Sequence, residues 1–161
     1  MNQRKPFIKD QYACIKSGWE TIGDQRFYSR SGYETDVACW LEYQRKKGEI
    51  DLWCHEPFRI DFPIARSKGY IVDFVCYKII DGEKRIVRMI EVKGQIKKSD
   101  FTKIKRLKKY YPEYFKVFCY VCNGSYIDVI RHELKVNHVV DIKEIKNYQS
   151  FFRSQIGYKP T

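Results

Sequence analysis

Hydrophobic positions recur along the chain with two different periods, and the first clear element has the helical one. Apolar and large side chains follow one another at intervals of three or four residues, at Tyr33, Val37, Trp40, Leu41 and Gln44. Ser31 and Glu34 precede them at the spacing of a capping box, in which each side chain accepts a hydrogen bond from the other residue's backbone N–H. Gly48 is typical of a helix end. The pattern predicts a helix from about residue 32 to residue 47.

Strand-like alternation dominates the middle of the chain. The segment IDLWCHEPFRIDFPI (50–64) alternates apolar and polar positions, with breaks near Pro57 and Pro63. Two longer segments, GYIVDFVCYKII (69–80) and RIVRMIEVKG (85–94), flank DGEK and predict a β-hairpin. KVFCYVCN (116–123) predicts a further buried strand.

Helical periodicity returns between the hairpin and the last of these strands. In SDFTKIKRLKKYYPEY (99–114), Ser99 stands at the N-cap position and Pro112 lies close to the end. The apolar stripe of this helix consists of Phe101, Ile104, Leu107 and Tyr111. A weaker helical pattern covers residues 143–153.

This order of elements predicts an α/β or α+β fold with one mixed sheet flanked by helices. The second helix joins strand 86–93 to strand 116–122 as a crossover, so these two strands are expected to be parallel. We divide the chain into an N-terminal arm (1–28), a core (29–125) and a C-terminal extension packing on the core (126–161). The arm is expected to pack through Trp19, Phe27 and Tyr28.

Charge indicates the kind of partner. The chain of 161 residues has 31 Lys and Arg against 20 Asp and Glu, a formal net charge of +11, which favours binding to polyanions. No apolar run approaches the roughly 20 residues of a spanning helix, so no membrane partner is expected. The N-terminus has no apolar segment typical of a secretory signal, so a cytoplasmic protein is expected. Together with the positive charge, this predicts nucleic acid as the partner.

The six cysteines predict thiols and not a zinc site. Cys14, Cys39, Cys54 and Cys76 are scattered singly among apolar neighbours, which is typical of reduced, buried cysteines. Cys119 and Cys122 form a C-x-x-C motif, but within a strand these two positions point to opposite faces. No second pair completes a zinc site.

Charged residues interrupt the apolar strand RMIEVKG (88–94). Glu91 and Lys93 lie two residues apart and therefore on one face. A two-residue turn at Asp81 and Gly82 places Asp73 opposite Ile90, with Glu91 on the other face. A three-residue turn ending in a bulge places Asp73 opposite Glu91.

In the second register the two carboxylates repel one another unless a cation lies between them. Mg²⁺ or Mn²⁺ is the cation that hard oxygen ligands and a phosphate fit best. Lys93 would then lie beside the metal, where it can orient or deprotonate a water or stabilise charge on the phosphate.

These residues resemble the D…(D/E)-x-K signature of the PD-(D/E)XK nuclease superfamily, with Asp73 followed by Glu91-Val92-Lys93. Together with residues 27–50, HEPFRIDFPI (55–64), YIVDF (70–74) and EVKG (91–94), the chain resembles phage endonuclease I-type junction-resolving enzymes over about residues 27–122. The resemblance implies a core in the order α-β-β-β-α-β. Val72 departs from the signature, which often has proline there.

The resemblance also implies roles for the site residues. Asp73 would be the central metal ligand, Glu91 the second ligand and Lys93 the catalytic lysine, while the backbone carbonyl of Val92 is a further ligand. Glu34, on the first helix, would be a catalytic carboxylate near the metal; its alternative role is the local capping box. Glu56 is expected in a salt bridge or at a strand edge, and His55 in the core or in solvent.

A run of basic residues follows the site, with almost no acidic partner in the sequence. It favours contacts with the phosphate backbone of DNA, although a solvated helix face is the alternative. The run consists of Lys97, Lys98, Lys103, Lys105, Arg106, Lys108 and Lys109. The glycine-rich phosphate-binding motifs G-x-x-x-x-G-K-[ST] and G-x-G-x-x-G are both absent from the sequence, so no nucleotide cofactor is expected.

The sequence therefore predicts a Mg²⁺-dependent endodeoxyribonuclease that hydrolyses phosphodiesters in branched DNA such as a Holliday junction, in a phage or mobile-element context and in the host cytoplasm. Resolution of a junction needs two active sites and thus a homodimer. The alternatives are a nicking or processing nuclease, of the packaging, head-completion, restriction or transposition kind, and a nucleic-acid-binding module without catalysis.

Overall fold

A five-stranded mixed sheet forms the centre of the molecule, which is known from a computed structural model that describes residues 17–160. The strands lie in the order β3-β4-β5-β6-β7, with β3, β4 and β5 antiparallel and β5, β6 and β7 parallel. Their bounds are β3 Leu52–His55, β4 Phe74–Ile80, β5 Glu83–Lys93, β6 Phe118–Cys122 and β7 His138–Asp141. The predicted mixed sheet, the hairpin and the parallel pairing across the crossover helix are confirmed.

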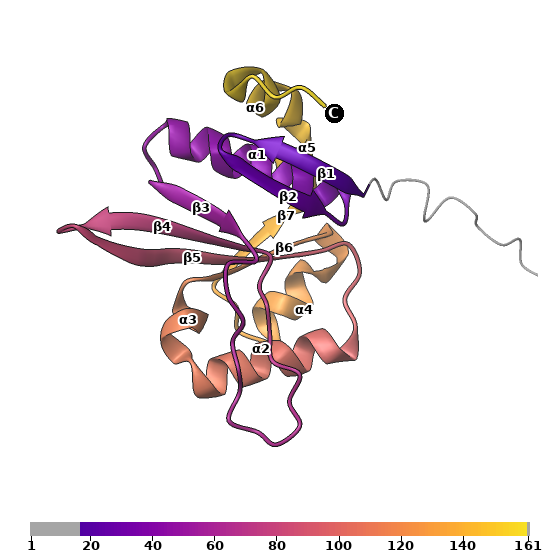
Figure 1. Cartoon of the computed structure of the whole chain (residues 1–161). Helices are drawn as coiled ribbons and strands as arrows, with labels where there is room; N and C mark the ends of the chain where they lie inside the picture. Colours follow the sequence, from indigo (N-terminus) through magenta and orange to yellow (C-terminus); the bar gives the residue numbers. More distant parts are fainter. Residues whose placement is uncertain (1–16, 161) are drawn as a thin grey trace, which may run out of the picture.

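Helices cover both faces of this sheet (Figure 1). One face carries α1 (Gly32–Lys46), α5 (Ile142–Asn147) and α6 (Gln149–Ile156), together with a separate hairpin of β1 (Gly18–Ile22) and β2 (Gln25–Ser29). The other face carries α2 (Lys98–Tyr110), α3 (Pro112–Lys116) and α4 (Ile127–His132), which follows the short helix η2 (Gly124–Tyr126). The molecule thus has three layers, a common arrangement for burying both faces of a sheet.

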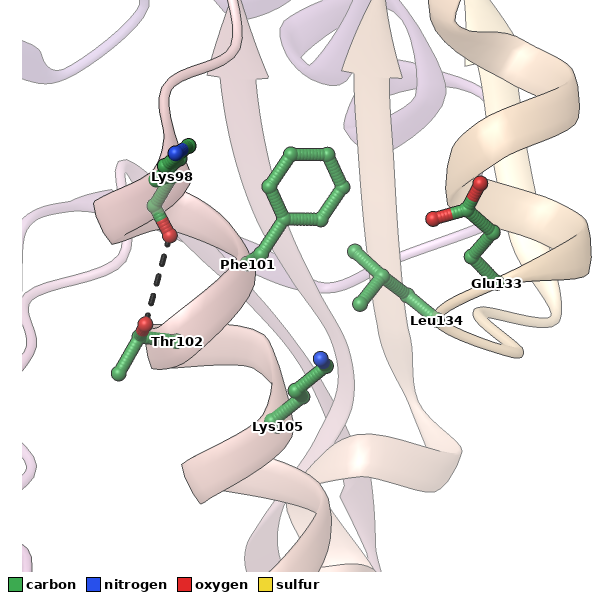
Figure 2. A pocket seen from close by; sticks show the side chains of 6 residues that line it. All are labelled: Lys98, Phe101, Thr102, Lys105, Glu133 and Leu134. Atoms are coloured by element: carbon green, nitrogen blue, oxygen red, sulfur yellow. Dashed lines mark hydrogen bonds between the residues drawn. The ribbon is translucent and has the colours of Figure 1, made fainter.

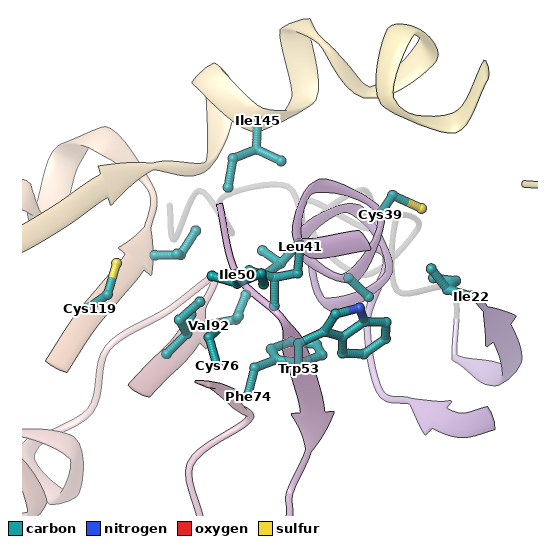
Figure 3. Close-up of a cluster of buried hydrophobic side chains, with 14 of the residues drawn as sticks. Ile22, Cys39, Leu41, Ile50, Trp53, Phe74, Cys76, Val92, Cys119 and Ile145 are labelled. Carbon is teal, nitrogen blue, oxygen red and sulfur yellow. The ribbon is translucent and has the colours of Figure 1, made fainter. Parts of the chain in front are cut away.

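Two apolar clusters fill the spaces between the layers. The first lies under α1 and includes Leu41, Trp53, Phe74 and Val92, all buried (Figure 3). The second lies under α2, with Val75, Met89, Ile104 and Leu107 among its members. Because β4 and β5 contribute alternate residues to the two clusters, each side of the sheet can be assigned to one helical layer.

Helix α1 begins as the sequence predicts. Ser31 is the N-cap, and its Oγ accepts a hydrogen bond of 3.3 Å from the backbone N–H of Glu34. The reciprocal bond differs from a capping box, because the Glu34 carboxylate accepts from the N–H of Arg30 at 3.0 Å. The helix ends at Lys46, with Gly48 close behind it.

The start of α2 was predicted wrongly. Its N-cap is Lys97 and not Ser99. The carboxylate of Asp100, in the first turn, accepts a hydrogen bond of 2.8 Å from the backbone N–H of Lys97. An acidic side chain thus satisfies a free N–H group at the start of the helix. The predicted apolar stripe is confirmed, since Ile104 and Leu107 are buried in the second cluster.

Two further expectations need correction. Of the three aromatic residues expected to pack the arm, Phe27 is buried, while Trp19 and Tyr28 are exposed on the β1–β2 hairpin. Segment 50–64 contains one strand of the sheet, β3, after which an isolated pair between Ile60 and Tyr70 closes a long loop. The C-terminal extension supplies the edge strand β7 and the helices α5 and α6.

The C-x-x-C motif lies as expected, with Cys119 in the first apolar cluster and Cys122 in the second. In the described residues the cysteines are free thiols, at positions 39, 54, 76, 119 and 122. Cys14 lies outside the described residues. The helices within residues 17–160 include none that is long and apolar enough to span a membrane.

Candidate active site

A bulge in β5 determines which residues face Asp73. The turn between β4 and β5 has two residues, Asp81 and Gly82, both with positive φ (53° and 78°), and Ile80 pairs with Glu83. With this turn alone, Asp73 would lie opposite Ile90. The register shifts by one residue after Tyr77, however, because Val87 has no partner.

Beyond this bulge Cys76 pairs with Arg88 and Phe74 with Ile90, so the next position of the ladder sets Asp73 opposite Glu91. The predicted link between turn length and register is therefore wrong. The turn has two residues and the carboxylates still meet, because the extra residue lies inside the strand. The bulge also turns Glu91 and Lys93 toward the α2 layer, the side to which Val75 and Tyr77 point.

The two opposed carboxylates are both buried, with Asp73 7% and Glu91 3% exposed. Asp73 Oδ2 accepts a hydrogen bond from the backbone N–H of Val92 at 2.7 Å. Glu91 Oε2 accepts from the hydroxyl of Tyr70 at 2.8 Å, and Glu91 Oε1 lies 2.9 Å from Lys93 Nζ. Lys93 Nζ is also 3.8 Å from Oδ1 of Asp100.

Burial and mutual repulsion act together on these carboxylates. Burial raises the pKa of Asp73 well above its ordinary value; the charges of Glu91 and Glu34 raise it further, against the Val92 N–H and Lys93, which lower it. Burial also raises the pKa of Glu91, although Lys93 and the Tyr70 hydroxyl oppose this effect. Unlike a structural ion pair, the site thus has an excess of negative charge.

Lys93 is surrounded by carboxylates. Burial lowers its pKa, but the charges of Glu91, Asp73 and Asp100 outweigh burial, and the pKa is raised. The ammonium group is therefore the stable form near neutral pH. It can donate hydrogen bonds and stabilise negative charge.

Glu34 reaches the site from the first turn of α1. Its side chain is buried, and Oε2 lies 3.6 Å from Nε2 of His55 in addition to its bond with the Arg30 N–H. Its charge acts on Asp73, which places it in the electrostatic field of the site. It also takes part in the helix start, so its local and its site interactions coexist.

The structure adds three residues that the sequence analysis did not select. Tyr70 donates to Glu91, and Asp100 lies near Lys93 while it caps α2. His55 is half-buried against the ring of Phe27 and faces Glu34; within the described residues its Nε2 has no hydrogen-bond partner. The order D…E-x-K carries no signal for any of them, because each approaches the site through the tertiary fold.

Glu56 forms the predicted salt bridge, since its Oε1 lies 2.7 Å from Nη1 of Arg30. The Glu56 carboxylate is thus paired with Arg30. Within residues 17–160, no three side chains of His, Cys, Asp or Glu lie close enough together to form a complete metal-binding group. The oxygen donors that do face one another, Asp73 and Glu91, are of the type that Mg²⁺ prefers.

The basic residues of α2 lie on more than one side of the helix. Lys98 and Lys105 line a hollow with Glu133 and Leu134, so one side of α2 faces an acidic residue from the end of α4 (Figure 2). Lys103 lies on another side, 5.6 Å from the ring of Tyr70, and its charge lowers the pKa of Glu91. The run is therefore not uniform in its surroundings.

Comparison with known proteins adds no relative. No family model matches this chain, and neither a curated protein nor a solved structure is significantly similar to it. The class of the protein must therefore be inferred from the site itself.

Proposed function

We propose that this protein is a Mg²⁺- or Mn²⁺-dependent DNA endonuclease of the PD-(D/E)XK type. The observation that carries the proposal is the approach of two buried carboxylates, Asp73 directly before β4 and Glu91 near the end of the antiparallel strand β5, with Lys93 on the same face of β5. A protein stabilises such a pair poorly by itself, whereas a divalent cation relieves the repulsion.

The element order supports this class. From α1 onward the chain runs α1, β3, β4, β5, α2, α3 and β6, which contains the expected order α-β-β-β-α-β with one extra short helix. Asp73 precedes β4, and Glu91 and Lys93 end β5, as the signature requires. The net charge of +11 and the basic residues of α2 suit a DNA substrate.

Each residue has a distinct role in the proposed hydrolysis. Asp73, Glu91 and the carbonyl of Val92 would hold the cation, with Glu34 as a further carboxylate near it. A bound Mg²⁺ or Mn²⁺ supplies Lewis-acid stabilisation and a water of lowered pKa. Lys93, whose pKa the neighbouring carboxylates raise, would donate to the phosphate or to the attacking water.

Branched DNA is the substrate that we propose, on the resemblance to junction-resolving enzymes. A cleavage assay with linear duplex, flap and four-way junction tests both the activity and its preference. Equal cleavage of the three would favour a general nicking or processing nuclease, and binding without cleavage would favour a module without catalysis.

The site assignment is tested by Glu91→Gln, which keeps the shape of the side chain and its bond with Tyr70. We expect cleavage to fall by at least about 100-fold, the scale of removing one charge-stabilising group, while DNA binding is retained. Glu113→Gln, on the surface of α3, is the matched control and should cut like wild type. Wild-type cleavage by Glu91→Gln would show that the assigned site is wrong.

A further inference from the structure

A second basic hollow lies beside α2, on another side from the one shown in Figure 2. We call it the 66–106 pocket; it has a volume of about 310 Å³. The loop after β3 contributes Arg66, Ser67, Lys68 and Gly69 to it, next to Ala65. Helix α2 contributes Ser99, Thr102, Lys103 and Arg106.

The lining has four cations and three hydroxyl groups, and no carboxylate. Among the ion pairs of residues 17–160, none includes Arg66, Lys68, Lys103 or Arg106. The nearest acidic side chain on this loop, Asp61, lies 2.7 Å from Nε of Arg59 and is thus neutralised. Like charges converge on this pocket only at an electrostatic cost, which an anion removes.

Hydrogen bonds to its backbone fix the loop that carries Arg66 and Lys68. Ile60 and Tyr70 exchange two backbone hydrogen bonds of 2.7 and 2.8 Å, which close the loop. The hydroxyl of Tyr111 donates to the carbonyl of Asp61 at 2.6 Å and ties the loop to the end of α2. The pocket is therefore formed by two connected elements and not by a solvated lysine run.

The pocket adjoins the candidate active site through two residues. Gly69 lines the pocket, and the next residue, Tyr70, donates to Glu91. Lys103 lines the pocket too, lies over the Tyr70 ring, and acts on the charge of Glu91. An anion in the pocket is thus held on the same face of the sheet as the carboxylates.

We propose that the 66–106 pocket binds a backbone phosphate of the DNA other than the one that is cut, and so sets the position of the DNA at the carboxylates. Arginine, lysine and hydroxyl donors are the groups that bind DNA phosphates. This proposal rests on the proposed nuclease function. It assigns a role to Arg66 and Lys68, which lie outside the basic run of α2, and it separates Lys103 and Arg106 from Lys98 and Lys105.

The test uses a four-way junction with single methylphosphonates, which remove the charge of one phosphate at a time, and measures binding by fluorescence anisotropy without divalent metal. The double variant Arg66→Gln/Lys68→Gln changes two exposed loop residues, so its fold is retained. The matched control is Lys98→Gln/Lys105→Gln, which removes equal charge from the hollow that contains Glu133.

We expect the Arg66/Lys68 variant to bind at least roughly tenfold more weakly and to lose about one unit of salt slope, because the pocket binds one phosphate. One methylphosphonate position that weakens wild-type binding should have no effect in this variant, and should keep its effect in the control.

If both variants keep the same sensitive methylphosphonate positions, or if wild type has none, the pocket does not bind a DNA phosphate. Cleavage in Mg²⁺ is measured separately. A protein that cuts DNA but fails the phosphate test contradicts the pocket alone, and one that passes this test without cutting contradicts the nuclease alone.

Discussion

At the scale of single residues, Glu91 has one partner on each carboxylate oxygen. The Tyr70 hydroxyl and the Lys93 ammonium both favour its ionised form, so they oppose the raising of its pKa by burial. Their effect on Glu91 can therefore be measured by removing one of them.

Tyr70→Phe removes only the hydroxyl that donates to Glu91. The carboxylate then loses a bond that favours its charge, so its pKa rises and its affinity for a cation falls. We expect the Mg²⁺ concentration for half-maximal cleavage to rise by about 10- to 100-fold, as for other residues that orient a metal ligand. A Mg²⁺ titration of the cleavage rate measures this change.

Tyr120→Phe is the matched control. Tyr120 on β6 pairs with Glu91 on β5 and is also buried and aromatic, but within residues 17–160 its hydroxyl has no hydrogen-bond partner. Removing an unpaired buried hydroxyl costs no interaction, so stability and the Mg²⁺ titration should not change for the worse. Equal effects of the two substitutions would mean that Tyr70 acts through packing only.

Asp73 connects the site with stability. The folded state holds its proton more tightly than the unfolded chain, because burial and then Glu91 raise its pKa. Between its ordinary pKa of 3.8 and the raised value, the folded protein binds more protons. The stability of the metal-free protein therefore falls as the pH rises through this window.

Asp73→Asn removes this cost, and its amide can still accept the N–H of Val92. Without metal at about pH 8, we expect the variant to be more stable by roughly 0.5–2 kcal/mol, with cleavage lost. The gain should shrink toward pH 4, where Asp73 of wild type becomes protonated as well. Thermal unfolding at several pH values in EDTA measures it; a gain that does not depend on pH would contradict this account.

At the scale of elements, the strand β5 shows how far the sequence determines the site. The residues Asp73, Glu91 and Lys93 and their hairpin were predicted, because charges on an apolar strand are conspicuous. The bulge was not, because Ile86, Val87, Met89 and Ile90 are all apolar and the alternation is lost where the extra residue lies. Period alone cannot fix a face there.

Short elements with exposed apolar residues escaped prediction for a related reason. The β1–β2 hairpin has Trp19 and Tyr28 on its surface, so its sequence lacks the alternation of a half-buried strand. Strand β7 has four residues, too few to show a period. Both are stabilised by what they pair with, and this pairing is a tertiary property.

The bulge makes a prediction about the turn. Gly82 has a φ of 78°, and a Cβ added there would meet no atom within 4 Å. Gly82→Ala should thus cost about 1 kcal/mol, the penalty for a left-handed alanine. Cleavage should remain at the wild-type level, because the register at Asp73 is set beyond the bulge. Thermal unfolding and the cleavage rate measure the two effects.

Gly69→Ala is the contrast to this substitution. Its φ is 70°, and an added Cβ would collide with the Arg59 side chain and lie 2.8 Å from Oδ1 of Asp61. The exposed Arg59 and Asp61 side chains must then move, which disturbs their 2.7 Å ion pair next to Tyr70 and adds to the strain of a left-handed alanine, so both stability and cleavage should fall. If Gly82→Ala loses cleavage while its fold is intact, the turn and not the bulge sets the register at Asp73.

At the scale of the whole molecule, the two faces of the sheet differ in the residues that cover them. The first apolar cluster, under α1, α5 and the β1–β2 hairpin, stabilises the fold. The α2 face combines the opposed carboxylates with basic residues, so the negative charge of the site lies within a chain of net charge +11. On the proposed function, this face would attract a polyanion and bind a cation at its centre.

This arrangement predicts that divalent metal stabilises the whole molecule. On the proposed function, Mg²⁺ or Mn²⁺ would bind the folded state at Asp73 and Glu91, a pair that the unfolded chain lacks. At 100 times the dissociation constant the stabilisation is about 2.7 kcal/mol. For a chain of this length that corresponds to a rise in Tm of roughly 5–10 °C.

Thermal unfolding with increasing MnCl₂ measures the rise, with NaCl of equal ionic strength as the control for screening of the net charge. Asp73→Asn should start at a higher Tm without metal and should gain little from Mn²⁺, because the repulsion that the metal relieves has been removed. If the variant gains as much as wild type, the metal binds elsewhere on the protein. The proposed nuclease chemistry would then no longer follow from the opposition of Asp73 and Glu91, because that chemistry depends on a cation bound between them.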